Sequence, residues 1–176
     1  MMEKIDKQKC PVCLTDNLTL MQEEMDIPFF GKTYLFTMQC SSCQYKKTDI
    51  ESEGQKDPVK ITFEINSEDD MKVRVVKSSE ATIKIPQLRM SVESGPGSEG
   101  YVSNIEGVLD RFKKIIEGER DDSEDDNTKK HAKNLLKKLW KVKLGDLAVK
   151  IIIEDPSGNS AIISKKAVIE KLKVKK

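Results

Sequence analysis

Two short cysteine motifs decide the fold: Cys10-Pro11-Val12-Cys13 and Cys40-Ser41-Ser42-Cys43. Each has the spacing of a tight turn that directs two sulfurs at one ion, and 26 residues separate the motifs. Extended stretches at 18–25 and 33–39 flank Ile27-Pro28-Phe29-Phe30-Gly31, which predicts a hairpin that brings the motifs together. We therefore expect one structural Zn²⁺ bound by Cys10, Cys13, Cys40 and Cys43. The alternatives are an iron site, free cysteines or a redox pair.

The position after each motif is often Gly in zinc-binding turns, but here it holds Leu14 or Gln44. A positive φ costs a residue other than Gly about 1 kcal/mol. Structural zinc contributes a binding free energy of about 10 kcal/mol or more. We therefore expect the site to tolerate both residues. Three lysines flank the motifs and offset part of the negative charge of the four thiolates: Lys9, Lys46 and Lys47.

Composition indicates a soluble, highly charged protein with enough apolar residues for one core. The 176 residues are 37% hydrophobic and 35% charged, with a formal net charge of +1. No apolar run approaches the roughly 20 residues that span a bilayer, so we expect no membrane partner. The charged N-terminus lacks the apolar stretch of a signal peptide, and we expect a reducing, cytoplasmic location.

The segment after the second motif alternates apolar and polar residues, as half-buried strands do. Ile61, Phe63 and Ile65 share one face, and Met71, Val73 and Val75 share another. Short strands this closely spaced predict a sandwich or a jelly-roll-like barrel. The expected strands are 60–65, 71–75, 81–85, 88–92, 148–153 and 161–163.

Two amphipathic helices interrupt the strands. Ser103 and Glu106 form the pattern of a capping box, and the acidic run 121–126 separates the helices. A polar loop between two such helices predicts a helical hairpin. The apolar stripe of the first contains Ile105, Val108, Leu109, Phe112, Ile115 and Ile116, and that of the second Ala132, Leu135, Leu136, Leu139 and Trp140.

Residue types argue against an enzyme. His131 is the only histidine, and it lies among lysines at the start of the second helix, where a solvated side chain is expected. A jelly-roll iron site with two histidines therefore cannot be built from this sequence. The glycine-rich stretch 95–100 has neither of the common phosphate-binding patterns. We expect a binding protein.

Several segments together resemble the ZPR-type zinc-finger family. They follow the family's order and cover nearly the whole chain from Cys10 to Ser160. Gln44 replaces a usual Gly, and Lys46-Lys47-Thr48-Asp49 departs from the common Arg and Asn-Glu, which bears on partner contacts more than on zinc. The segments are 25–30 (MDIPFF), 40–45, 70–78 (DMKVRVVKS), 83–88 (IKIPQL), 105–109 (IEGVL) and 153–160 (IEDPSGNS).

The resemblance implies a single-module, archaeal-type member, whereas eukaryotic members carry two modules in tandem. It implies a zinc-ribbon-like finger followed by a double-stranded β-helix (jelly-roll-like) domain, a mostly β fold with an α-helical hairpin. We expect the finger over 1–53, the β domain over 54–164 with the hairpin inserted at about 103–142, and a basic C-terminal tail over 165–176. The family binds translation elongation factor 1-alpha and is implicated in folding that GTPase, so this factor is the implied partner.

Four residues are candidates for partner contact. Phe29 and Phe30 form an apolar hairpin tip that either anchors a partner or packs onto the β domain. Arg74 and Lys77 lie on the polar side of a strand, where solvated charge is the alternative. The alternative function is a nucleic-acid-binding zinc ribbon that uses the basic C-terminal third; its binding would weaken steeply with salt. Asp155 to Ser160 has the composition of a tight turn.

Overall fold

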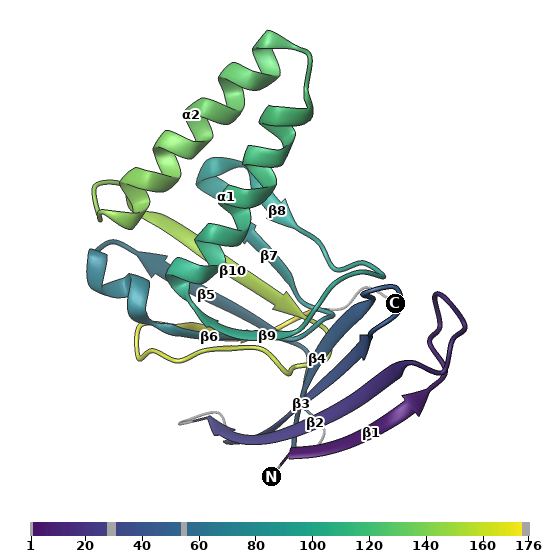
Figure 1. Cartoon of the computed structure of the whole chain (residues 1–176). Helices are drawn as coiled ribbons and strands as arrows, with labels where there is room; N and C mark the ends of the chain where they lie inside the picture. The colour runs from purple at the N-terminus through teal and green to yellow at the C-terminus, as the bar shows by residue number, and fades with distance from the viewer. Residues whose placement is uncertain (1, 28–30, 54–55, 174–176) are drawn as a thin grey trace.

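The computed structural model describes residues 2–27, 31–53 and 56–173. Over these residues it is mostly β, with three antiparallel sheets, two α-helices and two short 3-10 helices. The first sheet and the helical hairpin lie at opposite ends of the molecule, with the other two sheets between them (Figure 1). The predicted fold class is confirmed.

The N-terminal sheet, here called the finger sheet, has the order β1-β2-β3-β4. Its long central hairpin pairs Leu18 with Cys40 at one end and Ile27 with Gly31 at the other, as the sequence predicts. Two outer strands were not predicted. The strands are β1 (Met2–Gln8), β2 (Leu18–Ile27), β3 (Gly31–Cys40) and β4 (Lys46–Ser52).

The other two sheets form the jelly-roll domain, in the orders β12-β5-β10-β7-β8 and β11-β6-β9. In β5, Ile61, Phe63 and Ile65 are all buried, which confirms the face predicted from alternation. The strands are β5 (Val59–Ile65), β6 (Arg74–Lys77), β7 (Thr82–Ile85), β8 (Met90–Val92), β9 (Tyr101–Asn104), β10 (Val149–Asp155), β11 (Ala161–Ile162) and β12 (Val168–Lys171).

Two of the predicted strands begin later than the pattern indicated, because short 3-10 helices precede them. Glu68–Lys72 forms the helix η1, so Met71 is buried from a helix and β6 starts only at Arg74. Pro86–Leu88 forms the helix η2 before β8. Alternation over four or five residues does not distinguish a strand from a turn of helix followed by a strand.

The predicted helical hairpin is present as α1 (Ile105–Asp122) and α2 (Asp126–Lys143). The capping prediction was wrong by one residue: Asn104, not Ser103, caps α1, since its Oδ1 accepts from the Gly107 N–H at 2.8 Å. No helix among the described residues is long and apolar enough to cross a bilayer.

Two members of the predicted apolar stripes are exposed. Ile115 of α1 is 47% exposed and Trp140 of α2 is 65% exposed, whereas Leu139 and Val142 are buried. Trp140 lies toward the edge of the buried face of α2, next to the buried Leu139. The assignment of Ile115 and Trp140 to the buried stripes was wrong.

The predicted basic tail over 165–176 contains a strand. Val168–Lys171 forms β12, which pairs with β5 at the edge of the larger jelly-roll sheet. All four of its residues are exposed, which explains why the sequence shows no alternation there.

Candidate metal centre

The four cysteines come together at the end of the finger sheet. Their four Sγ atoms all lie within 4.8 Å of one another. The Sγ atoms of Cys10 and Cys43 are 3.7 Å apart, and those of Cys13 and Cys40 are 3.6 Å apart. A tetrahedron with Zn–S bonds of about 2.3 Å requires S···S separations of about 3.8 Å, so the donor set fits one zinc ion.

The two turns that carry the cysteines share two backbone features. Leu14 and Gln44 both have φ of 61°, the left-handed conformation expected there. The amide N–H of Cys10 donates to the Thr15 carbonyl, and that of Cys40 donates to the Tyr45 carbonyl, both at 2.8 Å. Each turn therefore closes on itself, and pairing of β2 with β3 brings the turns together.

The thiols would not all ionise without a cation. The backbone N–H groups of Cys43 and Ser42 direct positive charge at Cys40 and, against the effect of burial, lower its pKa to about 6. The Tyr45 N–H acts to lower the pKa of Cys43, but desolvation and the neighbouring sulfurs outweigh it and raise that pKa to about 12. A bound Zn²⁺ would keep all four sulfurs as thiolates, and four protein ligands leave no open position for catalysis.

The core around this centre is small. Leu18 is the one fully apolar side chain buried beside Cys10 and Cys40 among the described residues. The partly buried residues packed there are Leu20, Met38 and Tyr45. So little apolar burial indicates that the metal supplies much of the order at this end of the sheet. Of the flanking lysines, Lys9 and Lys46 are exposed and Lys47 is half-buried.

The other end of the finger sheet is joined to the jelly-roll domain by apolar packing. Ile27 and Ile50 of the finger sheet form one buried cluster with Val76 and Ala161 of the three-stranded sheet. The Gly100 N–H donates to the Thr48 carbonyl at 2.8 Å, so β4 is also held through its backbone. The two parts are therefore packed together as one body.

Polar side chains close the same junction. The Asp49 carboxylate accepts from the N–H and the hydroxyl of Ser79, at 3.1 and 2.7 Å. The Asn159 Oδ1 accepts from the N–H of Ser52 at 3.2 Å and from its hydroxyl. These bonds give a structural role to Asn159 in the turn 155–160 and to Asp49, which lies in a segment where the sequence departs from the family pattern.

The turn at 155–160 is organised by a fully buried carboxylate. Asp155 Oδ2 accepts from the hydroxyls of Ser78 and Ser160 at 2.9 and 2.6 Å, and Oδ1 accepts from the hydroxyl of Ser157 at 2.7 Å. Gly158 has φ of +73°, and a Cβ there would strike the Asp57 carbonyl. The sequence identified the turn but not this hydroxyl network.

The predicted contact residues differ in their surroundings. Arg74 is exposed, as a solvated or partner-binding side chain would be. Lys77 is only 4% exposed, so the reading of it as a solvated charge was wrong. Phe29 and Phe30 lie outside the described residues.

Fold and site together define a protein with a four-cysteine zinc finger joined to a jelly-roll domain. The ZPR1 zinc-finger domain model matches residues 4–58, and the ZPR1 jelly-roll domain model matches residues 69–176. The chain belongs to the ZPR1 family.

The relatives differ in length. A ZPR1-like protein of Methanocaldococcus jannaschii is 37% identical over 163 residues, which cover 92% of this chain and 82% of that protein. A ZPR1-like protein of Pyrococcus horikoshii is 36% identical, over 93% of this chain and 75% of its own length. The zinc finger chaperone zpr1 of Schizosaccharomyces pombe is 27% identical over 77% of this chain, which matches only 30% of that protein.

Proposed function

We propose that this chain is a zinc-stabilised binding protein that recognises translation elongation factor 1-alpha and assists its folding, without catalysing a reaction. It would act in the cytoplasm, where its cysteines stay reduced. The observation that carries the proposal is the junction: the zinc-held finger sheet and the jelly-roll domain share one buried cluster and several hydrogen bonds. Two packed parts can present one continuous surface to a partner.

The area that a protein interface needs supports a binding surface shared by the finger sheet and the jelly-roll domain. A standard protein interface takes about 800 Å² from each partner. The finger sheet is one layer of four strands with little core of its own, so we expect the jelly-roll domain to contribute part of the contact. Arg74, exposed on β6 of the sheet that packs against the finger, remains our candidate for such a contact, as do Phe29 and Phe30, which the sequence alone indicates. The chaperone role carried by the name of the Schizosaccharomyces pombe relative agrees with this proposal.

Trp140 favours nucleic-acid binding as the second candidate. It is 65% exposed on α2, and the same helix exposes several lysines: Lys130, Lys133, Lys137, Lys138 and Lys141. An exposed indole can stack on an unpaired base while lysines contact phosphates. Binding of this kind would depend on Trp140 and would weaken steeply with salt.

Direct binding to purified elongation factor 1-alpha tests the proposal. The zinc-loaded chain should bind the factor in at least one nucleotide state or during its refolding, with weak salt dependence, and Cys40→Ser should abolish binding. Trp140→Ala tests the second candidate, because it should weaken binding to single-stranded RNA if the helix is the functional surface. Absence of any binding to the factor, with salt-sensitive RNA binding that Trp140→Ala removes, would replace the first proposal by the second.

A further inference from the structure

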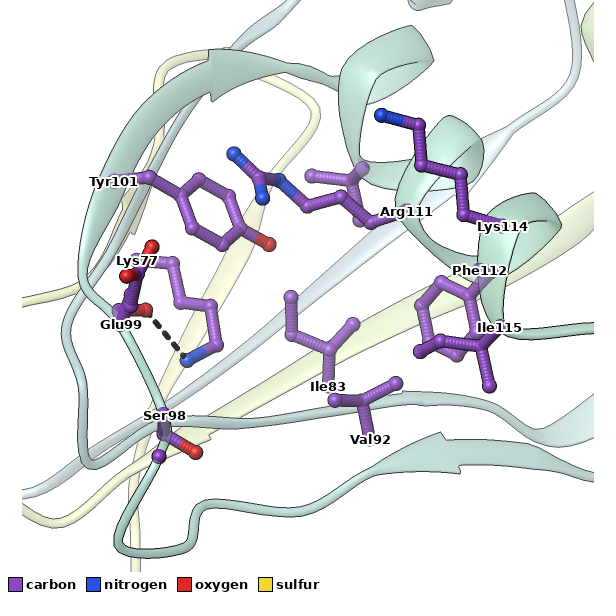
Figure 2. Close-up of a pocket in the computed structure, with 12 residues that line it drawn as sticks. Lys77, Ile83, Val92, Ser98, Glu99, Tyr101, Arg111, Phe112, Lys114 and Ile115 are labelled. Atoms are coloured by element: carbon purple, nitrogen blue, oxygen red, sulfur yellow. Dashed lines mark hydrogen bonds between the residues drawn. The ribbon is translucent and has the colours of Figure 1, made fainter. Parts of the chain in front are cut away.

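A cavity of about 350 Å³ lies between α1, the strands β6 to β9 and the loop before β9. Figure 2 shows Lys77, Tyr101 and Arg111 on one side of it and apolar side chains on the other. We call it the cationic pocket. Its apolar lining consists of Ile83, Val92, Val108, Phe112 and Ile115.

Lys77 is the buried cation of this pocket. Its Nζ donates to the Ser78 carbonyl at 2.8 Å and to the Glu99 carbonyl at 3.5 Å (Figure 2), and it lies 5.7 Å from the centroid of the Tyr101 ring. Among the described residues no carboxylate forms an ion pair with it. Burying an ammonium group without a contacting anion is costly, so this charge needs a reason.

Two nearby carboxylates, one buried and one half-buried, do not supply a complete reason. Asp155 and Asp49 act on Lys77 at longer range, and both are already engaged by other donors. Asp155 accepts from three serine hydroxyls and Asp49 from Ser79. Lys77 therefore has donor capacity that its two carbonyl partners do not use, on the wall of a cavity.

Two more cations line the same cavity. The Arg111 guanidinium lies 3.9 Å from the centroid of the Tyr101 ring, and Lys114 follows one turn later on α1. Among the described residues neither forms an ion pair. Glu99 is the one acidic residue of the described lining, so three cations face one carboxylate.

An anionic group attached to an apolar body matches this combination. The carboxylate would face Lys77 and Arg111, while the apolar part would cover Val92, Phe112 and the half-exposed Ile115. A volume of about 350 Å³ is at the small end of the range for ligand sites, and is suited to one or two side chains rather than a large cofactor.

We propose that the cationic pocket binds a short acidic–apolar segment of a protein partner, in which an Asp or Glu lies next to a large apolar side chain. This deepens the proposed function, on which it rests for the identity of the partner. A carboxylate here would complete the coordination of a buried cation, so binding should depend on charge as well as on apolar contact.

The test uses the zinc-loaded full chain and two blocked peptides, acetyl-Gly-Phe-Glu-Gly-amide and its Gln counterpart. Titration followed by backbone amide NMR should show binding of the Glu peptide at least ten-fold tighter than of the Gln peptide. Signals of Tyr101, Arg111 and the loop 97–99 should shift. Equal affinity for the two peptides, or shifts confined to other surfaces, would overturn the proposal.

Variants assign the effect to the pocket. Lys77→Met, which keeps the length of the side chain, should lower the affinity for the Glu peptide at least ten-fold. Arg111→Gln should lower it by a similar factor. Lys113→Gln is the matched control, because Lys113 is exposed on α1 and does not line the pocket. Arg111→Gln keeps the test valid if Lys77→Met fails to fold. An equal loss with Lys113→Gln would show only a general charge effect and overturn the proposal.

Two further measurements separate this proposal from others. 3-Phenylpropionate carries the same carboxylate on a free small molecule, and tighter binding of it than of the Glu peptide would overturn a partner segment as the ligand. Binding of elongation factor 1-alpha is measured in parallel. Peptide binding that depends on Lys77, without binding of the factor, supports the pocket and defeats the proposed function. Binding of the factor without peptide binding supports the proposed function and overturns the pocket proposal.

Discussion

The finger sheet and the jelly-roll domain are both antiparallel, but different interactions hold their strands in place. The jelly-roll domain has one large buried cluster drawn from both sheets and both helices. At its free end the finger sheet has Leu18 and the cysteines, and at its other end an apolar contact with its neighbour. The jelly roll should therefore be stable through its own core, whereas the finger sheet depends on a metal and on a neighbouring surface.

Removing the metal is expected to have the largest effect. Cys40→Ser, or chelation of the native chain, should unfold the segment from Lys9 to Thr48, because little apolar burial remains to order it. Amide exchange should rise there and stay slow in β5 and β10, whose inward residues are buried. Metal analysis of the native chain should give one zinc per chain. Uniform loosening of the whole chain would contradict the division into a metal-dependent and a self-sufficient part.

Crowding the junction should have the next largest effect. A Cβ at Gly100 would lie 2.8 Å from the Ile50 backbone nitrogen, a distance at which the strand β4 must shift. We expect Gly100→Ala to destabilise the chain by about 1 to 3 kcal/mol, the usual cost of overpacking, and to separate unfolding of the finger sheet from that of the jelly roll. Gly97→Ala, in the same loop, meets nothing within 4 Å and serves as the control in thermal unfolding. Equal melting temperatures of the two variants would argue against tight packing between the finger sheet and the jelly-roll domain.

The difference between the regions also explains what the sequence could predict. Regular patterns identified the buried strand β5, the β2–β3 hairpin, the four ligands and the positive φ of Leu14 and Gln44. Strands β1 and β4 were missed because they are mostly polar: every residue of β1 is at least partly exposed, and β4 buries only Ile50 and Ser52. Their pairing is set by neighbours rather than by their own periodicity.

Individual side chains were harder to place than elements. Lysine is usually a surface residue, and only the packing of α1 over β9 makes Lys77 part of a cavity wall. Trp140 lies at the edge of an apolar stripe, and the stripe alone does not show how far toward its edge the helix is covered. The Asp155 network joins pairs of residues that lie between 77 and 82 positions apart in the chain. No local sequence pattern reveals such pairs.

Asp70 offers a pH-dependent test within the jelly roll. Burial acts to raise its pKa, but the Asn66 N–H, the Lys166 ammonium and Ser67 outweigh burial and hold the pKa below its ordinary value of 3.8. Its stabilisation is therefore fully present above pH 3.8 and is lost as pH falls through the lowered pKa. Asp70→Asn should cost about 1 to 2 kcal/mol near neutral pH, with zinc binding unchanged. Denaturant unfolding should show the difference from the native chain shrinking below that pH; a constant difference would contradict a role for the charge.

The smallest expected effect concerns the start of α1, and it tests a correction to the sequence prediction. Asn104 accepts the Gly107 N–H at 2.8 Å, so Asn104→Ala leaves that donor without its cap and should cost about 1 kcal/mol. Ser103→Ala, at the residue that the capping-box pattern indicated, should change stability by less than about 0.5 kcal/mol. Asn104→Asp, which keeps an acceptor at the same place, should restore most of the loss. All three substitutions lie in the self-sufficient part of the chain, so urea unfolding should register them while the zinc content stays at one. A larger loss with Ser103→Ala than with Asn104→Ala would return the cap to Ser103.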